Sequence, residues 1–474
     1  MRLPLLAKAA AIGVIVILLT AVLARVDGLV SERRMRQQSA MDSVVQALSS
    51  AQTLVGPLLQ RECTETWERL EGEGKQRKPV LHRRDFTLVR APDMLAVDSQ
   101  TAAEARYRGL FKVNGYASRT SLKSRWNDLL ALQPQRVQKD SRLQCEPITA
   151  WVALSDPRGI RAVRVTVDGA PIATRPGTAH ASFPLGLHAA LDAARSSRAD
   201  DPLEVSVHLE LVGTARLSLV PAAREVSWSL RSDWPHPSFG GRFLPASRIV
   251  DNSGFSARWA VSALASTAAA DVERGQALCS VQDRTADDEE PGPRDGPPNS
   301  AAPTRCVDAI DVSFIDPINP YSMTDRATKY ALLFIVLTFA AVALTEALAG
   351  RRVHPVQYTL VGLALALFYL LLLSLSEHLS FAAAYAAASS ACVLLLSYYG
   401  AHMLGRWRAG VAFGAGNALL YGLLWTLLRI EQWALAIGAV ALFSVLAAVM
   451  VLTRGIDWYA VSGRLRADRP TGRP

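Results

Sequence analysis

Two long apolar runs lie close together in the second half of the chain, at residues 331–348 and 356–375. Each has nearly the ~20 residues that a helix needs to cross a hydrocarbon core about 30 Å thick. A short basic loop containing Arg351, Arg352 and His354 joins them. The pair predicts a transmembrane hairpin, with a mostly polar chain before it and a mostly apolar chain after it.

Three further apolar runs follow this hairpin, so the C-terminal part of the chain predicts five spans. Their connections are short, and small residues such as Gly410 and Gly414 favour close helix packing in lipid. The predicted spans are residues 331–348, 356–375, 381–398, 411–428 and 434–452, within a helical bundle that we place at 321–453.

An apolar run also opens the chain, at residues 9–24 after Arg2 and Lys8. A cleaved signal peptide starts in the same way and is the alternative here. No small-residue cleavage site follows the run, so we predict an uncleaved transmembrane anchor at 1–28. Helix-like apolar spacing then predicts an amphipathic stalk at 29–53, which the first Gly-Pro pair ends.

The charge distribution sets the expected orientation. The chain has 474 residues, a net charge of +9 and 50% apolar residues. Much of the arginine lies beside apolar runs, which fits the positive-inside rule better than nucleic-acid binding. The loop with Arg351 and Arg352, the loop with Arg406 and Arg408, and the basic tail at 454–474 fall on one side if there are six spans. We therefore expect both termini in the cytoplasm of a bacterial inner membrane, with lipid and not nucleic acid as a partner.

The region between the anchor and the hairpin, residues 54–320, predicts one β-rich periplasmic domain. Short runs alternate apolar and polar residues, and turn signals such as Asp156-Pro157 and Asp168-Gly169 separate them. Many short strands of this kind indicate an antiparallel sandwich or related sheet assembly. We expect one helix to interrupt it near residues 122–132. The alternating runs are residues 85–90, 105–113, 150–155, 162–167, 203–211, 217–220 and 226–230.

Four of the five cysteines lie in this domain. In an oxidising compartment four cysteines permit three pairings. We favour Cys63 with Cys145 and Cys279 with Cys306, because each pair joins neighbours in the chain; free buried thiols are the alternative. The second pair flanks a Pro-, Gly- and acid-rich stretch, residues 283–304, which predicts a flexible insertion. The spacing matches no metal site.

The most aromatic stretch of the domain is residues 232–245, with three prolines that predict an irregular, rigid loop. Its candidate partner-binding residues are Trp234, His236, Pro237 and Phe239. The alternative is that these rings cap the end of the sandwich core, because large aromatic side chains dominate core burial.

Ionisable residues near the ends of the spans form a second candidate set. Asp325, Arg326 and Lys329 precede the second span, and Glu377 and His378 follow the third. We expect that these groups pair outside the bilayer and lock the domain on the helices. The alternative is that each is solvated or paired at the interface without a specific role.

No hydrolytic or nucleotide-binding signature is present: the chain has no GxSxG, HExxH or Walker A sequence. The histidines of the polar domain share no spacing. We therefore expect no enzymatic activity, no catalytic residue, no metal and no cofactor.

Short motifs occur in order across nearly the whole chain: LVGP at 54–57, SDWPHPSF at 232–239, FLPA at 243–246, GF at 254–255, TDRATKYA at 324–331, HPVQY at 354–358, FYLLLL at 368–373, LSEH at 375–378 and IDWY at 456–459. Together these segments resemble the CreD family of cell envelope integrity inner membrane proteins. The resemblance implies an inner membrane protein of the cell envelope, in a regulon that a two-component system controls under stress. It implies no reaction. The insertion at 283–304 and the cysteines depart from the family pattern.

The sequence thus predicts a polytopic α-helical membrane protein of six spans, with a large mainly-β periplasmic domain inserted between helices 1 and 2. The expected role is support of envelope integrity and the stress response, by binding an envelope protein or glycan. A transporter or channel for a small solute or lipid is the alternative, with the domain as a receiving module. A membrane enzyme acting on an envelope polymer is a third hypothesis.

Overall fold

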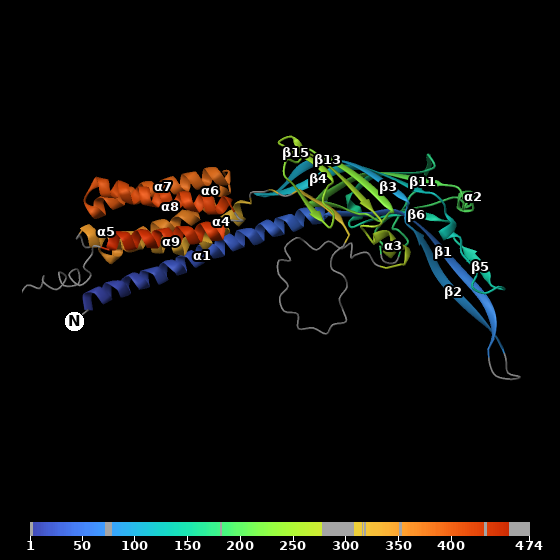
Figure 1. Ribbon diagram of the computed structural model, residues 1–474, viewed down its shortest axis with the longest axis horizontal. Helices are drawn as coiled ribbons and strands as arrows, with labels where there is room; N and C mark the ends of the chain where they lie inside the picture. The colour runs from blue at the N-terminus through green and yellow to red at the C-terminus, as the bar shows by residue number, and fades with distance from the viewer. Residues whose placement is uncertain are drawn as a thin grey trace, which may run out of the picture. The chain divides into compact units, whose positions relative to one another are not determined.

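A computed structural model describes residues 3–71, 78–180, 183–276, 308–314, 316, 319–349, 353–430 and 434–454 (Figure 1). The chain divides into two compact units. We call Met1–Gln38 with Ile318–Pro474 the helical unit and Ser39–Pro317 the β unit, and describe each by itself. Several predicted features lie outside the described residues: the insertion at 283–304, Cys279, Cys306, Arg351, Arg352 and the tail from residue 455.

The helical unit contains the described helices after the β unit, together with most of the long first helix, α1 (Leu3–Ala47). Four described helices are long and apolar enough to cross a membrane, and a fifth span results if the bent pair α4–α5 counts as one. The bend between these two helices is 45°. The later helices are α4 (Pro320–Lys329), α5 (Ala331–Ala349), α6 (Pro355–Ser376), α7 (Phe381–Leu404), α8 (Trp407–Arg429) and α9 (Ala434–Thr453).

Local sequence explains where these helices begin and end. His354 caps α6 in a capping box with Gln357, and Pro355 occupies the first helical turn, where its missing N–H costs nothing. Gly405 ends α7 in the left-handed conformation, with φ 64°. Glycines also let α7 and α8 approach closely, because a Cβ on Gly410 would lie 2.5 Å from Ala401.

The β unit is a sandwich of two sheets, so the predicted mainly-β domain is confirmed. Within the described residues the first sheet has the order β14-β17-β12-β1-β6-β10-β9, and β2 and β5 also pair with β1. It is antiparallel except where β1 runs parallel to β12. Its strands are β1 (Gln52–Glu71), β2 (Lys78–Arg90), β5 (Arg142–Cys145), β6 (Thr149–Leu154), β9 (Arg175–Pro176), β10 (Gly186–Ala190), β12 (Arg216–Val220), β14 (Pro237–Gly241) and β17 (Ile310–Phe314).

The second sheet has the order β15-β16-β13-β3-β4-β11-β7-β8 in the described residues, with β13 parallel to β3. Its β7–β8 turn is the predicted Asp168-Gly169, with φ of 48° and 83°, as a two-residue hairpin requires. Its strands are β3 (Met94–Arg108), β4 (Phe111–Trp126), β7 (Ile160–Val167), β8 (Ala170–Ile172), β11 (Leu203–Thr214), β13 (Glu225–Ser232), β15 (Ser247–Asp251) and β16 (Gly254–Ser262).

The main core lies between the two sheets. Leu54 and Leu59 of β1 face it from one side, and Leu122 and Trp126 of β4 face it from the other, all fully buried. A smaller cluster covers the opposite face of the first sheet, where the short helix α3 (Ala268–Glu273) packs its alanines and Val272. The alternating pattern of the strands follows directly from this burial of one face.

Two predicted elements are wrong, and a third is shorter than predicted. Residues 122–126 belong to β4, because alternation with period two continues to Trp126; a single 3₁₀ turn follows at Leu130–Leu132. The run at 105–113 contains the turn between β3 and β4. The helix of the predicted stalk ends at Ala47 and not at residue 53, because the residues from Gln52 onward have strand partners and a buried face.

Candidate functional site

The predicted aromatic loop is largely ordered sandwich. Trp234 is only 9% exposed and belongs to the main core, where its indole N–H donates to the carbonyl of His236 at 2.8 Å. Phe239 is partly buried and contacts Phe255 and Trp259 edge-on. Trp234 and Phe239 therefore pack at the core of the sandwich, which agrees with the alternative to a partner-binding loop.

The segment after Trp234 is a strand and not an irregular loop. Pro237–Gly241 form β14, which pairs antiparallel with β17 at the end of the first sheet. Proline is compatible with this position because an edge strand needs no second set of N–H donors. His236 is exposed and Pro237 is half-buried, so the four candidate residues do not form one accessible aromatic surface.

A hollow that is open to solvent lies on the second sheet, beside the segment that contains the four candidate residues. A shallow hollow of about 550 Å³ crosses the outer face of four neighbouring strands. Its middle row contains Ile249 of β15, Ser256 of β16, Arg231 of β13 and Gln100 of β3, each in register with the next. Asp233, within the candidate segment, also lines the hollow.

Exposed apolar side chains lie in and near this hollow. Ile249 lines the hollow and is 69% exposed, whereas Val250, which is 46% exposed, points to the opposite face of the same edge strand β15. Leu244, just before β15, is also exposed. We call the hollow together with β15 the β15 surface. The sequence analysis missed it, although the β-branched pair Ile249-Val250 next to Pro-rich residues was a usable signal.

The membrane-proximal ionisable residues are brought into ion pairs with α1. Asp325 accepts from Lys329 at 3.1 Å on its own helix and lies 3.5 Å from Arg34 of α1. Glu377, at the end of α6, pairs with Arg33 of α1 at 3.2 Å. The stalk arginines, absent from the predicted set, therefore join α1 to both α4 and α6.

Arg326 is half-buried on α4, and His378 is exposed after α6. Arg33 reaches Glu377 because α1 continues as a helix past residue 33. These contacts lie within the helical unit.

A second polar contact joins α1 to the same unit near residue 8. Lys8 pairs with Glu346 of α5, and the Tyr358 hydroxyl of α6 donates to the other oxygen of Glu346 at 3.2 Å. Lys8 and Arg33 are separated along α1 by roughly 37 Å at 1.5 Å per residue. That separation brackets a hydrocarbon core about 30 Å thick. The two contacts therefore suit the two ends of a span.

Two polar side chains inside the bundle bond to each other. Thr338 and Asn417 are both buried, and the threonine hydroxyl donates to the asparagine side-chain oxygen at 3.3 Å. The Asn417 amide also donates to the carbonyl of Phe413. These are contacts between and within helices, of the kind that stabilise helix packing in lipid.

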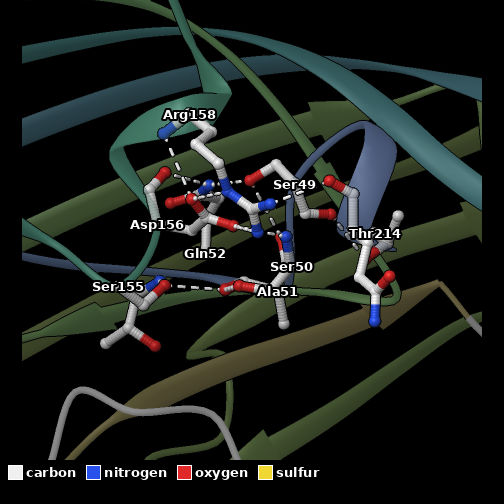
Figure 2. Close-up of polar contacts among 10 residues, drawn as sticks. Ser49, Ser50, Ala51, Gln52, Ser155, Asp156, Arg158 and Thr214 are labelled. Atoms are coloured by element: carbon white, nitrogen blue, oxygen red, sulfur yellow. Dashed lines mark hydrogen bonds and ion pairs between the residues drawn. The ribbon is translucent and has the colours of Figure 1, made fainter. Parts of the chain in front are cut away.

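The end of α1 is fastened into the β unit by a polar cluster that sequence reasoning missed (Figure 2). The Arg158 guanidinium donates to the carbonyl of Gln46, in the last turn of α1, at 2.8 Å. The same guanidinium donates to both carboxylate oxygens of Asp156, at 2.9 and 2.6 Å. Asp156 in turn accepts from the Ser50 N–H at 3.0 Å. One arginine thus satisfies a helix-end carbonyl and positions the carboxylate.

Neighbouring side chains complete the cluster. Gln52 is fully buried and donates to the Ser49 hydroxyl and to the Asp156 carbonyl. Thr214 of β11 donates to the Ser49 carbonyl at 3.0 Å. Gly159 is required here, because a Cβ would lie 2.4 Å from the Val212 carbonyl. The chain between α1 and β1 is therefore hydrogen-bonded both to β11 and to the loop that contains Asp156.

The charge of Asp156 is stabilised within this cluster. Burial favours its protonated form, but hydrogen bonds from Arg158 and from the Ser50 N–H outweigh burial and lower its pKa to about 2. The cluster is ionic over the whole physiological range.

A disulfide joins Cys63 of β1 to Cys145 of β5, the first of the two pairings that we favoured. Beside it the buried Glu65 carboxylate accepts hydrogen bonds from the Ser141 hydroxyl and from the N–H groups of Val137 and Gln138. The hydrogen bond from the Ser141 hydroxyl is the largest of the causes that lower the pKa of Glu65. Among the described residues, no group of three or more His, Cys, Asp or Glu side chains is placed to hold a metal ion.

Apolar helices of span length and a large β-sandwich between α1 and α4 define the class: this is a multi-pass membrane protein with one mainly-β unit. Comparison with known proteins specifies the family. The family model described as "Inner membrane protein CreD" matches residues 4–459, and the chain belongs to this family. It is similar to the inner membrane protein CreD of Escherichia coli (strain K12), with 34% identity over 465 residues, covering 97% of this chain and 95% of that protein. The resemblance inferred from the motifs is confirmed.

Proposed function

We propose that this protein is a non-enzymatic inner membrane protein that supports envelope integrity under stress by binding an envelope component or a protein partner through its β unit. Six spans, with both termini in the cytoplasm and the β unit in the periplasm, are part of the proposal. The charge of the loops supports that orientation. The helix α9 (Ala434–Thr453) coincides with the sixth expected span.

One observation carries the proposal: the β15 surface. Its hollow is open and mixed in polarity, and the edge strand beside it exposes two apolar side chains, Ile249 on the side of the hollow and Val250 on the opposite face. Exposed apolar side chains rimmed by polar ones indicate an interaction site. Transport is less well supported, because the buried polar pair Thr338 and Asn417 is a helix–helix contact.

The test is in-cell photocrosslinking from position 249, with the fully exposed Leu264 as the matched control position on the same unit. We expect a discrete adduct with an envelope protein or glycan from position 249 and none from position 264. We also expect Ile249→Asp with Val250→Asp to lower survival under envelope stress at unchanged protein level. Adducts confined to the same chain at position 249, or identical adducts from both positions, would contradict the proposal.

A further inference from the structure

The edges of the two sheets differ in how they are protected. An edge strand presents unpaired N–H and C=O groups that can pair with another chain, and proteins block such edges with proline, charge or short length. Most described edge strands here carry proline, at Pro237 of β14, Pro176 of β9, Pro171 of β8 and Pro79 of β2.

Two described edge strands lack proline, and they differ in kind. β5 has four residues, and Cys145 ties it to β1 through the disulfide. β15 has five residues, all exposed, and among the described residues it pairs with β16 alone. Its centre is the β-branched pair Ile249-Val250, flanked by Arg248 and Asp251, with no lysine and no proline in the strand. Among the described edge strands, β15 is therefore the one that neither proline nor a disulfide protects.

The hollow lies on the same sheet and ends at this edge. A strand added to β15 would continue the row that runs through Ile249, Ser256 and Arg231. Its alternate side chains would lie at the open end of the hollow, since side chains of one face repeat every second residue. The backbone hydrogen bonds would then provide affinity, and the hollow would select among side chains. Known cases of strand addition divide affinity and specificity in the same way.

We propose that β15 binds an extended polypeptide segment of a protein partner by antiparallel or parallel strand addition. The proposal rests on the proposed function and specifies the partner class for the same surface. A second copy of this chain is a less suitable occupant. A five-residue edge buries far less than the roughly 800 Å² per partner of a stable interface, whereas a longer peptide can use both the edge and the hollow.

The register of the β15–β16 hairpin identifies the N–H groups that an added strand could bond. The two-residue turn Asn252-Ser253 closes the β15–β16 hairpin, with Asp251 opposite Gly254. Hydrogen-bonded and non-hydrogen-bonded pairs alternate in such a hairpin, so the N–H groups of Arg248 and Val250 point to the open edge. Val250→Pro removes one of these donors, and Val250→Thr is the matched control that keeps it.

The experiment uses the full chain in lipid nanodiscs and a phage library of random linear peptides as the probe. We expect peptides enriched on the wild type and on Val250→Thr but not on Val250→Pro. Each enriched peptide is then synthesised with single N-methyl groups along its backbone. Methylation at every second residue should weaken binding about fivefold or more, because each pairing position loses a hydrogen bond. The intervening positions should tolerate it.

The N-methyl series keeps the test decisive even if Val250→Pro disturbs the hairpin, since it uses the unaltered protein. Uniform tolerance of methylation, or no enrichment on the wild type, would overturn strand addition. Concentration-dependent dimers that Val250→Pro abolishes, without any peptide enrichment, would overturn it in favour of self-pairing. A position-249 adduct in cells combined with a flat N-methyl series would leave the proposed function standing and reject strand addition alone.

Discussion

Arg158 donates a hydrogen bond of 2.8 Å to the main-chain carbonyl of Gln46, so a loop of the sandwich caps the last turn of α1. This arginine is also bonded to Asp156, whose carboxylate accepts the Ser50 N–H just beyond the helix. The helix end and the start of β1 thus share one ionic contact.

Replacement of Arg158 should loosen this connection. Arg158→Ala leaves the Gln46 carbonyl without this donor and Asp156 without its ion-pair partner, and we expect a loss of about 1 kcal/mol, because Arg158 is half exposed. Hydrogen exchange of the full chain should become faster at residues 46–52. Arg161→Ala, an exposed arginine on β7, is the control and should leave exchange there unchanged. Equal exchange in both variants would show that Arg158 does not fasten the helix end.

The same contact predicts a pH dependence. The pKa of Asp156 falls from 3.8 in the unfolded chain to about 2 in the folded one, so its contribution is complete above pH 4 and is lost as pH falls towards 2. We expect about 1 kcal/mol, less than the full shift implies, because Arg158 is half exposed and screened. The difference in thermal midpoint between wild type and Asp156→Asn should shrink over this range. A constant difference would refute the assignment.

The pairing of Arg33 with Glu377 can be tested by charge exchange. Arg33→Glu and Glu377→Arg should each lower the thermal stability of the detergent-solubilised protein, by about 1–2 kcal/mol, since the glutamate is mostly buried and loses its counter-charge. The double exchange should recover most of that loss. Arg36→Glu, whose arginine pairs with Glu32 on the exposed side of α1, should have little effect. Additive damage in the double variant would mean that the two residues act separately.

The disulfide predicts sensitivity to reductant. Cys63 and Cys145 are 82 residues apart, and loss of a bond closing a loop of that size typically costs about 2–5 kcal/mol. Cys145→Ser should therefore lower the thermal midpoint and abolish the further effect of reductant on the β unit. The comparison is made with Cys279 and Cys306 already replaced by serine. A reductant effect that persists in Cys145→Ser would point to another thiol.

Local sequence patterns predicted much of the fold. Period-two alternation identified β6, β7, β11, β12 and β13, and apolar length identified the later helices to within a few residues at most ends. The pattern failed where two signals competed. Residues 122–132 contain leucines at helical spacing as well as alternation, and burial of Leu122, Ser124 and Trp126 against the opposite sheet favoured the strand.

The candidate sites depended more heavily on long-range contacts. Aromatic composition drew attention to Trp234 and Phe239, which the sandwich buries, while the exposed pair Ile249 and Val250 lay ten residues or so further on. Charge placement drew attention to Glu377, which forms an ion pair with Arg33. Its partner Arg33 is more than 300 residues away in the chain, and no local pattern connects them.

The sequence by itself determined the apolar spans, the β character of the region between them and the family, because span length, side-chain alternation and ordered motifs are local properties of the chain. The tertiary structure decided which aromatic rings are buried, which strands lie at the sheet edges, and which charges meet. Those properties arise when segments far apart in sequence come together, since a side chain's exposure and partners are set by the neighbours that folding supplies.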